Sequence, residues 1–217
     1  MKAITKISVV LIVFFFQCAN AQLKTDTLVS KKIFTNIKEA LKNPENVFNL
    51  DLSNQELNVE PQIWSKFINL ENLNLSNDHL KNIPNEITQL KNLKVLNLSG
   101  NDFSELPKDF KKLKNIQEIY FNNDKAFDLK KNIIFLEQLP NLKILHLEND
   151  NLETLPSDIK KLNNLEKLYL NDNSFKNIPI QIKGLDHLQY LDLRSNQLKV
   201  PSVELERHNF GIKIQFN

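Results

Sequence analysis

The chain has 217 residues, with 28 Lys and Arg against 26 Asp and Glu, three glycines and one cysteine. Two lysines and the cysteine lie in residues 1–21, so residues 22–217 carry 26 basic and 26 acidic side chains and no cysteine. This composition excludes disulfides and cysteine metal sites from residues 22–217, and it leaves no basic tract of the kind that binds nucleic acid or anionic membranes. The glycines lie too far apart for a phosphate-binding loop.

Residues 1–21 have the pattern of a secretory signal peptide. Two lysines precede an apolar run at 7–16, and the small residues Ala19 and Ala21 occupy the positions that signal peptidase reads. The run is shorter than the about 17–25 residues that a membrane-spanning helix needs, which favours cleavage before Gln22 over a membrane anchor. We therefore expect an exported protein (secreted, periplasmic or at the cell surface) without a membrane span after cleavage.

Two short segments precede the body of the chain. Residues 22–30 carry little apolar content, and we expect a disordered lead-in there. Residues 31–46 are interpreted as an N-terminal cap. Their apolar positions have helical spacing and predict a capping helix: Ile33, Ile37, Ala40 and Leu41.

Prolines recur at a nearly fixed period in the body of the chain. Most steps are of 22 or 23 residues, and one of 49 covers two units: Pro61, Pro84, Pro107, Pro156, Pro179 and Pro201. A period of this size indicates a solenoid, in which one supersecondary unit is stacked many times. Each unit gains its stability from its neighbours, because one unit alone cannot bury its apolar face.

The apolar spacing within a unit predicts its shape. Leu73 and Leu75 are two residues apart, which places both side chains on one side of a short strand. Ile83, Ile87 and Leu90 are three or four apart, which suits a helical or 3₁₀ return segment. Each unit is therefore predicted to be a strand, a turn and a return segment.

These units resemble the leucine-rich repeat family. Its motif L-x-x-L-x-L-x-x-N-x-L matches five times, from Leu70, Leu93, Leu142, Leu165 and Leu188, and looser units start at Val47 and Ile116. The return segment 83–87 resembles the short L-P-x-x-I subclass common in bacteria. The resemblance implies an α/β solenoid of seven repeats over 47–201, curved, with a parallel sheet on its concave face.

Two regions depart from the regular period. The unit from Ile116 is three residues longer, and residues 125–139 suit a fuller helix on the convex side, although a simple insertion in a return segment is the alternative. At the end of the chain, residues 202–217 are interpreted as a C-terminal cap. Ile212, Ile214 and Phe216 alternate with polar residues there and predict a capping strand.

The asparagine slot of the motif, which forms a buried ladder in the family, is occupied unevenly. Asparagines fill it at Asn101, Asn173 and Asn196, whereas other units carry Gln55, Asp78, Asp124 and Asp150. Two aspartates in adjacent units, about 4.8 Å apart, should raise one pKa or recruit a cation such as calcium. The interpretation we favour is that the preceding Asn123 and Asn149 take over the ladder while the aspartates turn to solvent.

The resemblance also implies which side chains line the concave sheet. These are the third, fifth and seventh positions of each unit, and all three tyrosines of the chain fall among them. Tyrosine and arginine are frequent at binding hot spots, although tyrosine also simply suits half-exposed strands. The candidate partner-binding residues, gathered over the C-terminal half, are Tyr120, Ile144, His146, Tyr169, Tyr190 and Arg194.

The sequence gives little support for catalysis. His146 with Glu148, and His79 near Asp102, are the pairs that suit acid–base chemistry, but no nucleophile, metal set or cofactor motif accompanies them. We therefore expect a monomeric, non-enzymatic module that needs no cofactor or metal and binds a protein or peptide. The alternative is a structural or glycan-binding component of the cell envelope or surface.

Overall fold

The computed structural model describes residues 32–56, 59–199 and 211–216. The predicted signal peptide, the lead-in and most of the predicted C-terminal cap lie outside these residues, as does Pro201.

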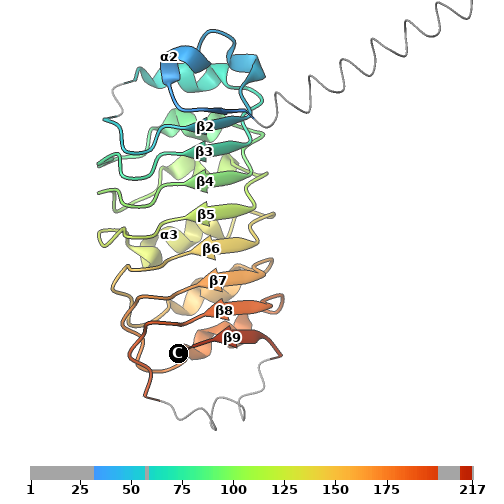
Figure 1. Cartoon of the computed structure of the whole chain (residues 1–217). Helices are drawn as coiled ribbons and strands as arrows, with labels where there is room; N and C mark the ends of the chain where they lie inside the picture. Colours follow the sequence, from blue (N-terminus) through green and yellow to red (C-terminus); the bar gives the residue numbers. More distant parts are fainter. Residues whose placement is uncertain (1–31, 57–58, 200–210, 217) are drawn as a thin grey trace, which may run out of the picture.

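Within the described residues, one open sheet of nine strands runs the length of the molecule (Figure 1). Every strand pairs in parallel with the next strand in sequence. The second leucine position of the motif aligns from unit to unit, as in Leu73 with Leu96. This topology confirms the predicted solenoid. The strands are β1 (Ile33–Phe34), β2 (Asn49–Asp51), β3 (Asn72–Asn74), β4 (Val95–Asn97), β5 (Glu118–Tyr120), β6 (Ile144–His146), β7 (Lys167–Tyr169), β8 (Tyr190–Asp192) and β9 (Lys213–Gln215).

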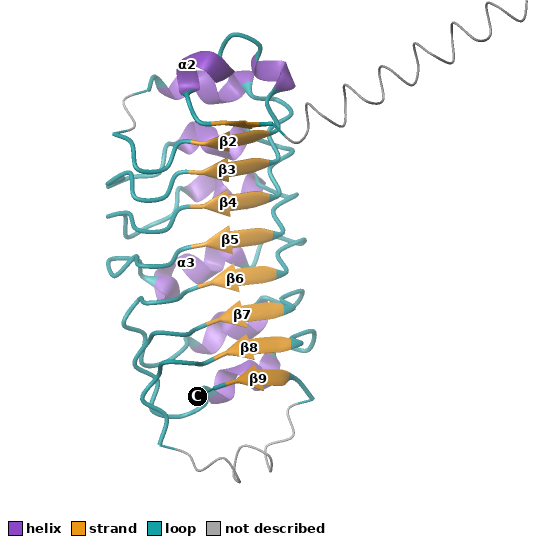
Figure 2. Cartoon of the chain, in the orientation of Figure 1, coloured by secondary structure: helices purple, strands orange, loops and turns teal. Residues whose placement is uncertain are grey.

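Short 3₁₀ helices and the helix α3 cover the back of the sheet (Figure 2). Proline stands just before most of them because its φ is fixed near the value that the segment needs, as at Pro107 with φ −63°. Its carbonyl then accepts the first turn's hydrogen bond, from the Phe110 N–H at 2.9 Å. The return segments are η1 (Pro44–Asn46), η2 (Pro61–Lys66), η3 (Asn85–Gln89), η4 (Lys108–Lys112), α3 (Leu129–Leu136), η5 (Ser157–Lys161) and η6 (Ile180–Gly184).

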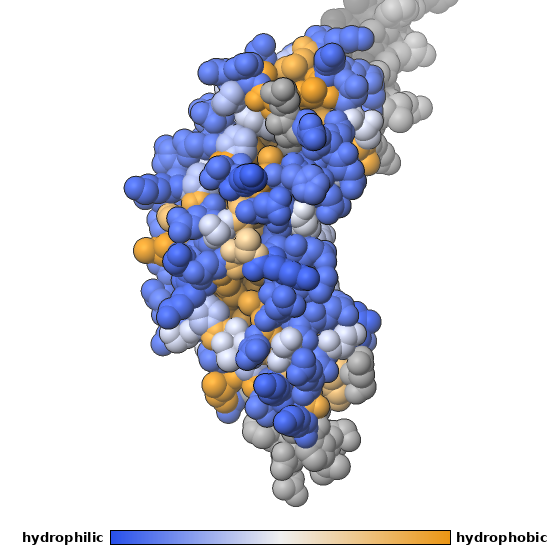
Figure 3. All heavy atoms as spheres, turned by 90° about the vertical axis from the view of Figure 1, so that its left-hand side faces the viewer, coloured by the Kyte–Doolittle hydropathy of each residue, from blue (hydrophilic) through white to orange (hydrophobic). Residues whose placement is uncertain are grey.

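A single apolar core lies between the two layers. The central residue of each inner strand is buried, with Leu96, Leu145 and Leu168 all at 0% exposure. A helical segment is wider than the spacing of about 4.8 Å between strands, so the stack bends toward the sheet. Figure 3 shows this bend as an arc hollowed on the sheet side, which makes the sheet the concave face.

The N-terminal cap is part helix and part strand. The helix α2 (Ile37–Ala40) has only four residues, and the Asn36 side chain caps it by accepting the N–H of Lys38 at 2.9 Å. The placement of Ile33 in the predicted helix was wrong, because Ile33 belongs to β1 and pairs with Asn49 of β2. The predicted C-terminal strand is confirmed as β9, and the fuller helix in residues 125–139 as α3.

The aspartates of the asparagine slot point inward, so the solvent-facing interpretation was wrong. Asp124 is 1% exposed, and its Oδ1 accepts the N–H of Asn101 at 2.6 Å. Asn123 holds the left-handed turn instead, with φ 61°, and forms a separate exposed contact with Asn149. Asparagine tolerates a left-handed backbone better than most residues, which explains its place in the turn.

A second asparagine ladder, which sequence reasoning missed, joins the return segments on the other side of the strands. An asparagine directly before the first motif leucine donates from Nδ2 to a main-chain carbonyl of the preceding unit, at 2.6–2.8 Å in five units. These donors are Asn69, Asn92, Asn115, Asn141 and Asn164. Each of these bonds, although exposed, joins one unit to the next and so contributes to the regular spacing of successive units.

Candidate functional site on the concave face

Four rings from four consecutive strands form a stack on the concave face. The His146 ring lies 3.9 Å from the Tyr120 ring and 4.3 Å from the Tyr169 ring, nearly parallel to both. Tyr190 continues the stack at 5.3 Å from Tyr169, tilted by 49°. The parallel register of β5 to β7 places Tyr120, His146 and Tyr169 side by side, because equivalent positions of adjacent strands are neighbours. Tyr190 joins from β8 at the position two residues earlier, since the register partner of Tyr169 is Asp192. We call Tyr120, His146, Tyr169 and Tyr190 the aromatic row.

Two carboxylates fix His146 within the aromatic row. Its Nε2 lies 3.0 Å from Glu118 Oε1 and its Nδ1 lies 3.1 Å from Glu148 Oε1. Carboxylates only accept, so both contacts are hydrogen bonds when both ring nitrogens carry a proton. Tyr120 donates its hydroxyl to the same Glu118 oxygen at 2.6 Å. Both imidazole nitrogens are therefore engaged by glutamates of the protein itself.

The aromatic row offers a partly buried surface made mainly of phenol rings. His146 is 8% exposed, so the tyrosines provide most of the surface that a partner can touch. Burial raises the pKa of Tyr120, Tyr169 and Tyr190, and nearby carboxylates raise it further. The phenols therefore remain un-ionised at neutral pH and can donate hydrogen bonds.

The other two predicted contact residues flank the aromatic row. Ile144 begins β6 and is half-buried, outside the ring stack. Arg194 is exposed, but its guanidinium is held by the fully buried Asp192, with Nη2 to Oδ2 at 2.6 Å. Burial alone would raise the pKa of Asp192, but the hydrogen bonds from Arg194 lower it overall. Arg194 therefore neutralises Asp192 first and offers only its remaining donors to a partner.

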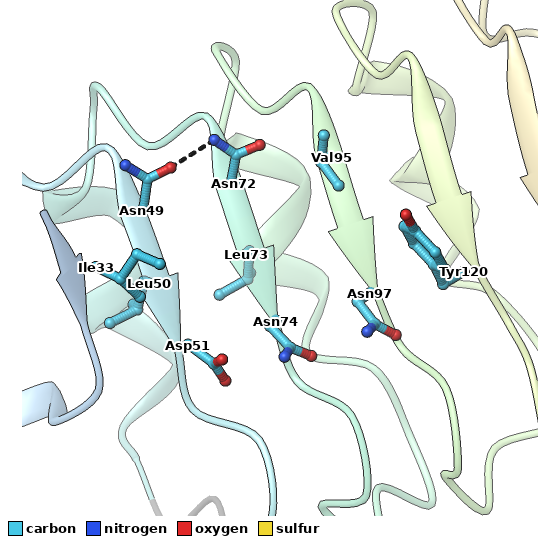
Figure 4. A pocket seen from close by; sticks show the side chains of 10 residues that line it. All are labelled: Ile33, Asn49, Leu50, Asp51, Asn72, Leu73, Asn74, Val95, Asn97 and Tyr120. Carbon is cyan, nitrogen blue, oxygen red and sulfur yellow. Dashed lines mark hydrogen bonds between the residues drawn. The ribbon is translucent and has the colours of Figure 1, made fainter. Parts of the chain in front are cut away.

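A shallow hollow of about 360 Å³ opens beside the aromatic row, over the N-terminal strands, and sequence reasoning did not identify it (Figure 4). Tyr120 stands at one end and Ile33 at the other. The repeated Asn at the strand positions was the available signal. The polar lining comprises Asn49, Asp51, Asn72, Asn74 and Asn97.

Hydrogen bonding inside the hollow leaves groups available for a ligand. Asn74 and Asn97 each use Oδ1 to accept the backbone N–H two residues on, at 3.1 and 3.0 Å. Their Nδ2 groups then remain as donors on the face, one strand apart. Asp51 accepts from Ser53 through Oδ1 alone, which leaves Oδ2 as an acceptor.

Other candidate chemistry is sparse in the part of the chain that the structure describes. The His79–Asp102 pair is 3.5 Å apart but lies open to solvent, with 84% of the histidine side chain exposed. Over the same residues, no three His, Cys, Asp or Glu side chains gather as metal ligands would. None of the described helices is both long and apolar enough to cross a bilayer.

Comparison with known proteins identifies the family. The leucine rich repeat model matches residues 68–125 and 139–198, more than half of the chain, so the protein belongs to the leucine-rich repeat family. No curated protein matches its sequence.

Solved structures share the fold. Internalin C2 of Listeria monocytogenes is 21% identical, with a TM-score of 0.59 over 80% of this chain and 72% of its own. A chain in the Toll–Spatzle complex of Drosophila is 18% identical, with a TM-score of 0.64 over 77% of this chain and 22% of its own. The plant peptide hormone receptor RGFR1, solved in complex with RGF2, is 26% identical, with a TM-score of 0.54 over 79% and 28%. This chain thus spans under a third of the Toll-complex and receptor chains.

Proposed function

We propose that this protein is an exported, monomeric binding module of the short bacterial leucine-rich repeat subclass, which holds a protein or peptide on its concave face. The aromatic row carries the proposal. Tyrosine rings are frequent anchors of interfaces because they combine a large apolar area with a hydroxyl. The comparison with a peptide hormone receptor supports the same class of ligand.

The aromatic row is rigid before any partner arrives. The imidazole fills the gap between Tyr120 and Tyr169, and Glu118 anchors the Tyr120 hydroxyl. Side chains that are already ordered lose little rotamer entropy on binding, so more of the contact energy appears as affinity. Only Tyr169, in the middle, has a hydroxyl without a hydrogen-bond partner among the described residues, which makes it the sharpest position to test.

Size limits the affinity of the sheet alone. Seven repeats at about 4.8 Å span roughly 29 Å, and the exposed strand segments are only about 10–16 Å long. That footprint is below the about 800 Å² per partner of a standard stable interface. The partner is therefore expected to contact the loops at the strand ends as well, or to bind weakly.

The test is a comparative cross-linking capture from the surface and secreted fractions of the source organism. Tyr169→Ala should lose a specific partner that the wild-type protein retains, because it removes the central ring of the aromatic row. Tyr169→Phe should keep most of the capture, and the exposed Lys111→Ala on η4, on the opposite layer, should keep all of it. Identical capture by wild type and Tyr169→Ala would contradict the role of the aromatic row.

A second candidate function is the binding of a neutral saccharide in the hollow beside Tyr120. Free amide donors on Asn74 and Asn97, an acceptor on Asp51 and an aromatic wall match a ligand that has both hydroxyls and an apolar face. We expect Asn97→Ala to weaken binding to a neutral oligosaccharide on a glycan array at least tenfold, and Lys111→Ala to leave it unchanged. An array without any neutral glycan bound by the wild type would exclude this function.

A further inference from the structure

The inward asparagine slot forms a continuous ladder across the repeats. From Asp78 to Asn173, each slot residue accepts with its Oδ1 the N–H of the slot residue one unit earlier, at 2.6–3.1 Å. The series runs without a break through Gln55, Asp78, Asn101, Asp124, Asp150 and Asn173. Asparagines and aspartates thus make the same first hydrogen bond.

The asparagines make further bonds that an ionised aspartate cannot make. Asn101 donates from Nδ2 to the carbonyls of Leu98 and Leu75, at 2.6 and 2.9 Å. Asn173 does the same to Leu170 and Leu147, at 3.1 and 2.7 Å. The second atom of the slot side chain therefore faces main-chain oxygens, and it must be a donor to satisfy them.

In the three aspartates that second atom is an oxygen, Oδ2. It is buried without a hydrogen-bond partner in Asp78, Asp124 and Asp150. Because their Oδ1 atoms occupy the same place as that of an asparagine, each Oδ2 takes the place of Nδ2, opposite carbonyl oxygens. An ionised carboxylate there would face carbonyl oxygens, which also carry negative partial charge, and in a buried site this repulsion is costly. A carboxylic acid would instead donate a hydrogen bond to them, as the amide does.

The charged groups that act on these sites do not offset an ionised carboxylate. The carboxylates of Asp150 and Asp102 raise the pKa of Asp124, and the carboxylate of Glu148 raises the pKa of Asp150. Asp78 is influenced by Asp51 and, in the opposite sense, by His79, which is exposed. The environment therefore favours the uncharged form at each slot.

We propose that Asp78, Asp124 and Asp150 stand in the ladder as neutral carboxylic acids that donate to main-chain carbonyls, and that the repeat array loses stability as they ionise. Burial supports this by raising the pKa of Asp124 to about 8, that of Asp150 to about 7 and that of Asp78 to about 6, from 3.8. The folded chain then binds more protons than the unfolded chain between about pH 4 and pH 8. The free energy of unfolding must fall as the pH rises through that window, and be highest at its acidic end.

The experiment is thermal unfolding of the protein from pH 5 to pH 8.5, in buffers containing EDTA. The Tm of the wild type should fall by about 5 °C or more over this range. Asp124→Asn should raise the Tm at pH 8 and flatten the profile, because the new Nδ2 can donate as in Asn101. The reverse change, Asn101→Asp, should steepen the profile, and Asp186→Asn, at an exposed position, should leave it unchanged.

Three results would overturn the proposal. The first is a wild-type Tm that rises or stays level as the pH rises. The second is an Asp124→Asn variant that is less stable than the wild type at pH 8, or unfolded, because an asparagine would then not replace the acid. The third is a Tm at pH 8 that rises on addition of calcium, in buffer without EDTA, in the wild type and not in Asp124→Asn, which would make the aspartates cation ligands. Carboxyl carbon NMR shifts of Asp124 give an independent reading of its protonation.

Discussion

At the residue scale, the concave face separates into residues that offer surface and residues that hold it in place. His146 is the main example of the second kind, because its ring is covered by Tyr120 and Tyr169 and its nitrogens are engaged by glutamates. Asp192 acts in the same way beneath Arg194. Substitutions at His146 or Asp192 should therefore disturb the surface indirectly, through the rings and guanidinium that they position.

Stability at this scale depends on the central strand residues. Leu145→Ala, at the fully buried centre of β6, should lower the free energy of unfolding by about 2–5 kcal/mol, because it leaves a cavity between the layers. Ile134→Ala on α3 is the matched control, since Ile134 is 53% exposed and should change stability by less than about 0.5 kcal/mol. Urea unfolding measures both variants. Equal losses at the two positions would contradict a core confined between the sheet and the return segments.

The positions of the tyrosines could be predicted from the sequence, but the hydrogen bonds around them could not. The period alone places Tyr120 and Tyr169 at equivalent strand positions, and Tyr190 on the same face two residues earlier in its unit. The contacts of His146 with Glu118 and Glu148 depend on rotamers in two strands, which no spacing rule specifies. The prediction that the aspartates face solvent was wrong although the sequence held a signal. Gly100 directly precedes the slot residue Asn101, and glycine there indicates that the residue before the slot has the left-handed backbone, which leaves the slot residue to point inward.

At the element scale, the regular units could be predicted because each one carries two independent signals, one for the strand and one for the return segment. Apolar residues two apart specify the strand, and the proline specifies where the return segment begins, with its φ near −63°. The cap was less predictable, because the four apolar residues at helical spacing include Ile33, which pairs with β2 instead. Ile33 can either extend the cap helix or pair with the open edge of β2, and pairing with the edge wins. The sequence of the cap alone does not reveal that this edge is available.

The helix α3 shows how a longer unit is accommodated. Asn132 is fully buried, accepts the N–H of Leu106 at 2.7 Å and donates to the carbonyl of Ser104 at 2.8 Å. One side chain therefore binds α3 to the loop of the preceding unit and satisfies that loop's backbone. The three additional residues of this unit extend the return layer and leave the register of β5 and β6 unchanged.

At the scale of the whole molecule, we propose that the chain is a monomer. Within the described residues, the large exposed apolar side chains come from four separate segments of the chain: Ile33, Ile68, Ile134 and Ile180. Light scattering after size exclusion should therefore give the mass of one chain, unchanged between low and high concentration. Reversible dimers or larger assemblies would instead favour a structural role in which the concave face or a sheet edge binds another copy.

The pairing of each strand with its immediate neighbours also determines how the chain unfolds under force. Among the residues that the structure describes, every strand is hydrogen-bonded only to the strands of the adjacent units, about 23 residues away in most cases. A pull on the two ends therefore loads the junctions in series, and the end units, which have one neighbour, have the fewest bonds to lose. Under tension the molecule should peel inward from its ends, one unit at a time, with the middle units yielding last.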